Sequence, residues 1–422
     1  MEILDKSGEE FRFDELATSE KSQEKLTGFI DLLRDEVEGE EKWNECCKKA
    51  DEELKTKPIT EEVLINLVDF FEKFQRRKTP GHDKGHEYRD ALTAIYNYSN
   101  IKDKVAYNAD ALAGLIGGIF HDVGVVIIPR GSDKDCGAGH GEAGAYFLDQ
   151  ECKKQNFLGE NMRKLVAYAI AAHTNYKEAF EVKQPKGYIK KPYWNEITEK
   201  EGKLYGVAMA MTRQSDRMDL YSVAQTVRNV VSQTYSELAG INGSYLTSEN
   251  TWVKCDDETL KNICSPIENS GDKKKPTTLQ QCLGFVNGID NPIYCNNDKY
   301  FPGFSEMIHY RAKQVEELNQ VMNGENQSMN LLETDKLDEV FKEAKETFYK
   351  ISKSNEKKFD LAWNGFKEQW NEMSNDYKNK WVRGFVFIEK TYEKILDDYQ
   401  KKLEGTDFPI LSNRIINELR VV

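Results

Sequence analysis

The sequence contains no hydrophobic run long enough to cross a lipid bilayer. Its longest apolar stretch, ALAGLIGGIF at 111–120, is well short of the roughly 20 residues that a membrane-spanning helix needs. The first residues, MEILDKSGEEFRF, also lack the basic leader and the apolar core of a secretory signal peptide. We therefore expect a soluble cytoplasmic protein that has no membrane partner.

The chain also lacks a net positive charge. The chain has 72 acidic and 59 basic residues, which gives a formal net charge of −13 at pH 7. A protein that binds duplex nucleic acid needs clustered Lys and Arg to contact the phosphate backbone, so this balance disfavours such a partner. The balance remains compatible with a locally basic pocket for a small phosphorylated substrate.

The eight cysteines include no CxxC pair, the spacing that would support a zinc knuckle. Cys46 and Cys47 are adjacent on an expected helix, which is a poor geometry for a mutual disulfide. Four others lie in one irregular region: Cys255, Cys264, Cys282 and Cys295. We expect free thiols in a reducing compartment rather than disulfides or a structural metal.

β-strand alternation is nearly absent, and helical periodicity dominates. The sequence PIT at 58–60, followed by Glu61 and Glu62, is typical of a helix start. Further helices are predicted over about 86–99, 108–122, 140–153, 159–174 and 203–235. The predicted fold class is therefore all-α.

Composition divides the chain into four parts. We predict an N-terminal helical segment at 1–57, a catalytic domain at 58–239, an irregular insertion rich in Cys, Gly and Asn at 240–305, and a helical C-terminal region at 306–422. Within the catalytic domain, 176–200 is a long loop, and such loops are usually functional lids or disordered segments. Its lysines form either a solvated cluster or a phosphate-guiding group: Lys183, Lys186, Lys190 and Lys191.

An aromatic stripe marks the C-terminal region. Its spacing of four and three residues predicts one face of a single helix: Phe359, Trp363, Phe366, Trp370, Met373, Tyr377 and Trp381. Such a stripe is more typical of a packing seam than of a ligand platform. The seam would form against the rest of the chain, against a second copy or against a protein partner.

Histidine is scarce, yet five of the six histidines fall within one part of the chain together with two aspartates. His121 and Asp122 form a doublet at the end of the apolar run GLIGGIF. The whole series has the order His82, His86, His121, Asp122, His140, His173 and Asp216. The remaining histidine, His309, is interpreted as an ordinary surface or packing residue.

These residue types suit a site for divalent metal ions. Neutral imidazole and carboxylate groups bind Mn²⁺, Fe²⁺, Zn²⁺ or Mg²⁺. A carboxylate beside a histidine on a helix can bridge two ions while the histidine binds one of them. We predict a first ion held by His86, His121, Asp122 and Asp216, and a second held by His140 and His173 with Asp122 shared.

This layout resembles the HD superfamily of metal-dependent phosphohydrolases, over roughly residues 80–225. The resemblance rests on the doublet, on the upstream run GHDKGHEYRDAL, and on SDRMDL, which is similar to the ADRLDA-type segment of many members. It implies an all-α HD-domain core, two bound divalent ions, and hydrolysis by metal-activated water.

The run HDKGH is similar to the HNxxH run of cyclic-nucleotide phosphodiesterases in this superfamily. In that family the first histidine protonates the leaving oxygen and the second binds metal, which implies that His82 is the general acid and His86 a ligand. The alternative for His82 is an outer-shell partner or a surface residue. Candidate substrate-binding residues are Lys84, Arg89, Gln214, Arg217 and Asp219, although the three cations among them also suit ion pairs.

We predict a phosphohydrolase or phosphodiesterase that cleaves a phosphoester in a nucleotide-like or nucleotide-derived substrate. One alternative is a diiron oxygenase of the same superfamily, which uses the same order of six ligands. Val125 argues mildly against it, because some of these oxygenases have a substrate-binding lysine at that place. The other alternative is a catalytically inactive metal-binding interaction protein.

Members that cleave cyclic dinucleotides have a double histidine near the fourth ligand and a GYP triplet. Here a single His173 is followed by Thr174, and Gly187 and Tyr188 are followed by Ile189. The chain therefore departs from that subfamily.

Overall fold

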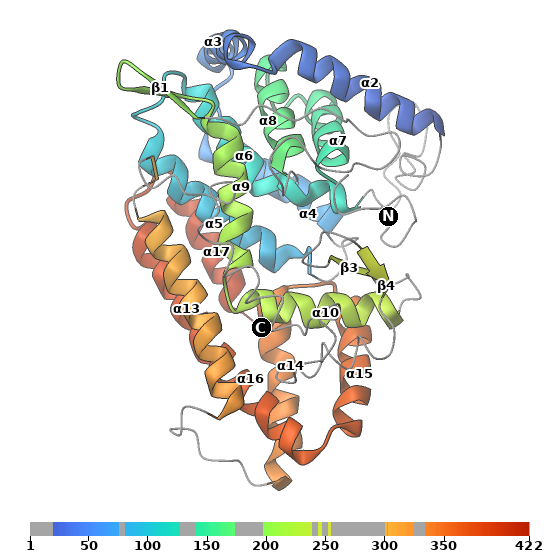
Figure 1. The fold of residues 1–422 in the computed structure, drawn as a ribbon. Helices are drawn as coiled ribbons and strands as arrows, with labels where there is room; N and C mark the ends of the chain where they lie inside the picture. Colours follow the sequence, from blue (N-terminus) through green and yellow to red (C-terminus); the bar gives the residue numbers. More distant parts are fainter. Residues whose placement is uncertain are drawn as a thin grey trace.

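The computed structural model describes residues 20–75, 81–126, 140–173, 197–238, 244–246, 252–254, 300–301, 303–324 and 334–421. This part of the chain is almost entirely helical (Figure 1). The strands within it form two short antiparallel hairpins: β1 (Thr198–Lys200) with β2 (Lys203–Tyr205), and β3 (Ser244–Leu246) with β4 (Trp252–Lys254). The predicted all-α fold class is confirmed.

The N-terminal and central helices follow the predicted order. They are α2 (Glu20–Val37), α3 (Glu40–Thr56), α4 (Glu61–Gln75), α5 (Lys84–Ile101), α6 (Asn108–Phe120), the 3-10 helix η1 (His121–Val126), α7 (His140–Lys154), α8 (Glu160–His173), α9 (Val207–Leu220) and α10 (Ala224–Leu238). The helices predicted from 86 to 174 correspond to α5, α6 with η1, α7 and α8.

Helix α6 lies inside the core, where it packs against α5, α8 and α9. Every residue from Ala109 to Phe120 is buried. A glycine allows this close packing, because a Cβ atom on Gly118 would lie 2.7 Å both from Ala94 Cβ on α5 and from Ser215 Oγ on α9. The run GLIGGIF thus brings the end of α6 close to both neighbouring helices.

Asp110 in α6 caps the N-terminus of α9, the helix that carries Asp216. Its carboxylate accepts hydrogen bonds from the backbone N–H groups of Gly206 (2.6 Å), Val207 (3.1 Å) and Ala208 (3.1 Å). The N–H groups at the start of a helix have no acceptor within the helix, so the buried carboxylate satisfies them. This contact orients α9 relative to α6.

Replacing Asp110 by alanine is expected to lower the free energy of unfolding by about 2–3 kcal/mol, because three N–H groups lose their acceptor inside the protein. Urea unfolding followed by circular dichroism measures the change. The control is Asp103→Ala, at an exposed position in the turn after α5. Equal stability of the two variants would contradict the capping role.

The C-terminal region contains α13 (Phe304–Asn323), the short 3-10 helix η4 (Thr334–Lys336), α14 (Leu337–Ser352), α15 (Glu356–Glu372), α16 (Asn375–Leu403) and α17 (Pro409–Arg420). Helix α16 packs against α13, α14 and α17. Helix α10 crosses α14 and α15 (Figure 1). Helices α14, α16 and α17 also contact α5, so the C-terminal region packs directly on the central helices.

The aromatic stripe is a packing seam within the chain, as one of the two interpretations predicted, but the single helix predicted for it is wrong. The stripe is divided between α15 and α16. Ser374 caps the start of α16, where its hydroxyl oxygen accepts a hydrogen bond from Tyr377 N–H at 3.4 Å. The rings of Trp363 and Trp370 stack on Phe341 of α14, with centroid distances of 4.6 and 4.5 Å.

The single helix predicted over 203–235 is also wrong. Residues 203–205 form β2, and the rest is divided between α9 and α10. At the break, the Ser222 hydroxyl donates a hydrogen bond to the carbonyl oxygen of Asp219 at 2.8 Å. A short polar side chain that bonds to the backbone in this way competes with the helical hydrogen-bond pattern.

Cys46, Cys47 and Cys152 are buried free thiols, as predicted for cysteines of this chain. The four cysteines predicted in the irregular insertion lie outside the described residues, as does the lysine cluster of the 176–200 loop. Within the described ranges, each helix is too short or too polar to span a membrane.

Candidate metal centre

His121 and Asp122 begin η1 directly after α6, and both side chains are buried. Gly124 in the same turn allows the start of α7 to approach, because a Cβ atom there would lie 1.9 Å from the carbonyl oxygen of His140. His173 is the last residue of α8, which packs against α7. The fold therefore brings the ends of three helical segments together around the doublet.

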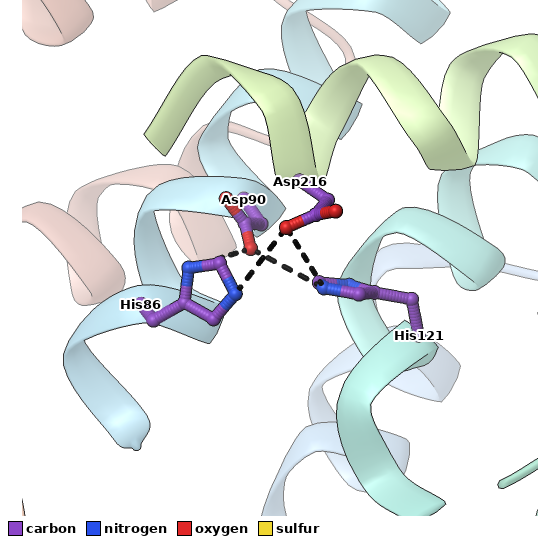
Figure 2. A group of neighbouring side chains, drawn as sticks. All are labelled: His86, Asp90, His121 and Asp216. Atoms are coloured by element: carbon purple, nitrogen blue, oxygen red, sulfur yellow. Dashed lines mark ion pairs between the residues drawn. The ribbon is translucent and has the colours of Figure 1, made fainter. Parts of the chain in front are cut away.

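Four side chains converge in the first cluster, which consists of His86, Asp90, His121 and Asp216 (Figure 2). Asp90 Oδ2 lies 3.1 Å from His86 Nδ1 and 3.6 Å from His121 Nε2. Asp216 Oδ1 lies 3.7 Å from His86 Nε2 and 3.9 Å from His121 Nε2. Carboxylate oxygens and imidazole nitrogens from α5, η1 and α9 thus surround one point, as the ligands of a single ion would.

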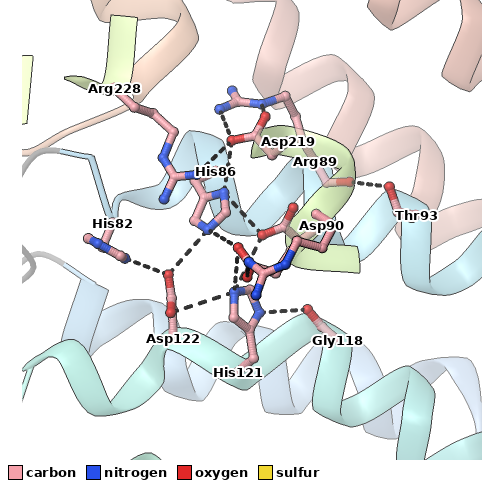
Figure 3. A network of polar contacts seen from close by, with 12 residues as sticks. His82, His86, Arg89, Asp90, Thr93, Gly118, His121, Asp122, Asp219 and Arg228 are labelled. Carbon is pink, nitrogen blue, oxygen red and sulfur yellow. Dashed lines mark hydrogen bonds and ion pairs between the residues drawn. The ribbon is translucent and has the colours of Figure 1, made fainter. Parts of the chain in front are cut away.

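Asp122 lies between this first cluster and a pair of histidines. Its Oδ2 atom is 2.8 Å from His82 Nδ1 and 3.2 Å from His86 Nε2 (Figure 3). Its Oδ1 atom is 3.2 Å from His140 Nε2, 3.6 Å from His121 Nε2 and 3.7 Å from His173 Nε2, and the Nε2 atoms of His140 and His173 are 3.1 Å apart. The carboxylate thus lies close to both histidines of the first cluster and to both histidines of the pair, which is where a bridging ligand would lie.

Unpartnered buried atoms show that the first cluster fits a cation. Among the described residues, His121 Nε2 and both carboxylate oxygens of Asp90 are buried and make no hydrogen bond. Burying such polar atoms without a hydrogen bond is costly, and a metal ion in the cluster would supply a partner for His121 and for the Asp90 carboxylate. The combination of imidazole nitrogen and carboxylate oxygen suits Mn²⁺, Fe²⁺ or Zn²⁺, and the carboxylates also suit Mg²⁺.

Acceptors behind the rings orient three of the histidines. His86 Nδ1 lies 2.8 Å from Asp219 Oδ2, His121 Nδ1 lies 3.2 Å from the Gly118 carbonyl oxygen, and His173 Nδ1 lies 2.6 Å from the Ile170 carbonyl oxygen. A neutral ring that donates from Nδ1 to such an acceptor carries its lone pair on Nε2. In each case Nε2 is the atom close to Asp122 or Asp216.

Burial controls the protonation of two predicted ligands. It lowers the pKa of His121 to about 3, and it also lowers the pKa of His173. Burial alone would raise the pKa of Asp122, but the neighbouring His121 and His82 rings hold it well below its usual range. At neutral pH Asp122 is therefore charged and the two histidines are neutral, which are the states that metal ligation requires.

His86 and Asp90 retain protons in the metal-free protein. Burial and Arg228 favour the neutral His86 ring, but the surrounding carboxylates, including Asp90, outweigh them and raise its pKa to about 9. Burial, together with the nearby Asp219, raises the pKa of Asp90 well above its usual range. A bound cation would displace these protons, because it stabilises the deprotonated forms.

Three of the residues predicted to bind substrate have other partners in the structure. The Lys84 ammonium lies 3.6 Å from a Glu72 oxygen and 3.4 Å from a Glu418 oxygen, and it does not join the cluster. Arg89 and Asp219 are buried and bonded to each other, and a substrate-binding role for them stays a prediction. Long-range partners of this kind cannot be recognised from spacing along the chain.

Arg217 and Gln214 lie near Asp216 in sequence but differ in surroundings. The Arg217 guanidinium donates to Asp216 Oδ2 at 2.6 Å, which places it beside the first cluster. Gln214 is buried, and neither of its amide atoms makes a hydrogen bond to a described residue. Their roles in substrate binding stay predictions.

Asp90 is the candidate ligand that sequence analysis missed. It follows His86 by four residues in HEYRD, a spacing that places both side chains on the same face of α5. That spacing was the available signal, but an i, i+4 pair of His and Asp also occurs in ordinary helix-surface pairs. Its complete burial beside His121 and Asp216 distinguishes it from such a pair.

Changing Asp90 to asparagine is expected to lower the affinity for Mn²⁺ by about 100-fold or more, because even residues behind the ligands cost 10–100-fold when replaced. Asparagine keeps the size of the side chain but removes the charge that a cation needs. Calorimetric titration of the metal-free protein measures the affinity, with the exposed Asp103→Asn variant as control. Unchanged affinity in Asp90→Asn would assign Asp90 a purely structural role.

Comparison with known families agrees with this geometry. A family model described as the HD domain matches residues 92–209. The matched segment contains the doublet together with His140 and His173, and it lies between His86 and Asp216. No curated protein and no solved structure matches the chain.

Proposed function

We propose that the chain is a metal-dependent phosphohydrolase, which cleaves a phosphoester in a nucleotide-like or nucleotide-derived substrate, because the HD-domain model matches residues 92–209. HD domains are mostly metal-dependent phosphohydrolases. The observation that carries the proposal is the position of Asp122, whose Oδ2 atom faces His86 and whose Oδ1 atom faces His121, His140 and His173. Two ions on either side of this carboxylate would form a dinuclear site.

Metal ions bound there would activate water and neutralise the charge that develops on the phosphoryl group. The chain's own residues hold this site in a buried environment, since the side chains of the first cluster and Asp122 are almost fully inaccessible to solvent. Arg217 adds a positive charge next to Asp216. We infer that Arg217 balances the negative charge of the site, in addition to any contact that it makes with substrate.

His82 is the proposed proton donor to the leaving oxygen. Its side chain is 26% exposed, whereas the side chain of Asp122, to which it is hydrogen bonded, is 3% exposed. A group that is held by the metal site and also accessible to solvent is in a position to meet a substrate there. Its imidazole would transfer a proton to the departing alkoxide.

Metal analysis of the purified protein and an anaerobic substrate screen test the proposal together. We expect about two divalent ions per chain and release of product from a phosphodiester, a phosphomonoester or a nucleotide. The screen uses bis(4-nitrophenyl) phosphate, 4-nitrophenyl phosphate and nucleotides, with and without added Mn²⁺ or Mg²⁺. A chelator-treated sample is the control.

Different outcomes separate the alternatives. Bound iron with oxygen uptake and no anaerobic phosphate release would support an oxygenase instead. Bound metal with no turnover of any substrate would support an inactive interaction protein. Absence of metal together with absence of turnover in Mn²⁺ or Mg²⁺ would refute the proposed hydrolase.

A further inference from the structure

Helix α5, which carries two residues of the first cluster, begins against the end of α14 in the C-terminal region. A Cβ atom on Gly85 would lie 2.0 Å from the carbonyl oxygen of Ile351 and 2.8 Å from that of Ser352. Only a residue without a side chain allows this approach without a shift of the backbone. The last turn of α14 is therefore in direct contact with the first turn of α5, next to His86.

Arg89 connects this contact to the rest of the protein. It is fully buried, and its Nη1 atom donates to the Ile351 carbonyl oxygen at 2.7 Å and lies 3.4 Å from the hydroxyl oxygen of Tyr392 on α16. Carbonyl groups in the last turn of a helix lack partners within that helix, so Ile351 is free to accept this bond. One edge of the guanidinium is thus held by two C-terminal helices.

The other edge of Arg89 holds Asp219. Arg89 Nη2 donates to Asp219 Oδ2 at 3.0 Å, and Arg89 Nε donates to Asp219 Oδ1 (Figure 3). A second guanidinium, that of Arg228, lies 3.4 Å from the same Oδ2 atom. This paired geometry fixes the plane of the carboxylate, because the guanidinium fork matches its two oxygens.

Asp219 in turn holds the His86 ring through the 2.8 Å contact between Oδ2 and Nδ1. The contact directs His86 Nε2 toward Asp122 and Asp216. Carboxylates placed behind a ligating histidine set its tautomer and its orientation, and their loss weakens metal binding. The series Ile351, Arg89, Asp219, His86 is therefore continuous from α14 to the first cluster.

We propose that helices α14 and α16 complete the metal centre, with Arg89 and Asp219 acting as positioning residues for His86. The inference rests on the proposed metal site but not on the reaction that occurs there. It assigns a role to the C-terminal region, which lies outside the HD-domain match at 92–209. Docking of this region on α5 sets the affinity of the site for its ion.

Arg89→Met is the first test, with Mn²⁺ titrated into the metal-free full-length protein. We expect a 10–100-fold loss of affinity at a temperature where circular dichroism shows the variant to be folded. Arg89→Lys should recover part of the loss, because lysine keeps a positive donor toward Asp219. Tyr392→Phe should lower the affinity in the same direction but less, since Ile351 still holds Arg89.

The matched control is Tyr399→Phe. Tyr399 is buried on the same helix seven residues after Tyr392, but its hydroxyl pairs with Thr93 Oγ1 at 2.9 Å and not with Arg89. Its removal should leave Mn²⁺ affinity unchanged even if it lowers the unfolding temperature. A general loss of stability would affect both tyrosine variants, whereas the proposed positioning affects only Tyr392→Phe.

Gly85→Ala tests the contact without altering Arg89 or Asp219. The added methyl group must displace the end of α14, so we expect Mn²⁺ affinity to fall, whereas Gly28→Ala, with no atom within 4 Å of the added carbon, should bind normally. Wild-type affinity in folded Gly85→Ala and Tyr392→Phe would overturn the role of α14 and α16, whatever Arg89→Met does. A wild-type protein that binds Mn²⁺ but hydrolyses nothing would refute the proposed function. The Mn²⁺ affinities of the variants would still test the role of α14 and α16.

Discussion

Asp122→Ala is expected to abolish phosphoester hydrolysis and to reduce the bound divalent ions from about two per chain to one or none. Asp122 is the residue whose two oxygens face both sets of nitrogens, so no other described side chain can replace its bridging position. Its removal also leaves the buried histidines without the negative charge that favours a cation between them. Elemental analysis after gel filtration measures metal content, and product release measures activity.

Asp122→Asn provides a second variant that keeps the size of the side chain. It should lose activity to the same extent, because an amide is a much poorer bridging ligand than a carboxylate. Asp103→Ala, at an exposed turn, should retain both metal and activity. Two bound ions and normal turnover in folded Asp122→Ala would show that the bridging assignment is incorrect.

His82→Ala has the second largest expected effect, a fall in kcat of about 10²–10⁴-fold with metal content unchanged. The effect should depend on the leaving group of the substrate. An alkyl phosphoester releases a basic alkoxide that needs a proton, whereas 4-nitrophenolate leaves without one. The variant should therefore lose activity toward nucleotide esters and keep most of it toward bis(4-nitrophenyl) phosphate.

The competing role for His82 is support of Asp122, to which its Nδ1 atom is bonded at 2.8 Å. In that case His82→Ala would lose metal, and activity toward both substrates would fall together. His309→Ala is the matched control, since His309 is an exposed histidine of α13 whose Nδ1 atom bonds to the Ser305 carbonyl oxygen. It should leave metal content and both activities unchanged.

Helices were predictable where apolar spacing was regular and the ends were marked. The helix predicted over 140–153 is found at His140–Lys154, and the one predicted over 159–174 at Glu160–His173. The errors occur where helical spacing continues through a break. The aromatic stripe keeps its spacing across Ser374, so the turn between α15 and α16 could not be recognised from periodicity.

In the candidate site, too, some assignments could be made from the sequence and others could not. Spacing and residue type were sufficient to select His86, the doublet, His140, His173 and Asp216, all of which meet in the structure. Arg89 and Asp219 were assigned to substrate because a cation and a carboxylate near a metal motif can contact a ligand. In the folded chain they are bonded to each other, and residues of α14 and α16 contact Arg89.

The sequence by itself determined that the described part of the chain is helical, and it pointed to every candidate ligand except Asp90. Both properties depend on residue type and on spacing along the chain, which folding does not change. Only the tertiary structure decided that Asp90 joins the first cluster and that Arg89 connects it to Ile351. Asp90 Oδ2 lies 3.6 Å from His121 Nε2, and Arg89 bonds at 2.7 Å to Ile351, which is 262 residues further along the chain; close packing at Gly118 and Gly85 allows these contacts.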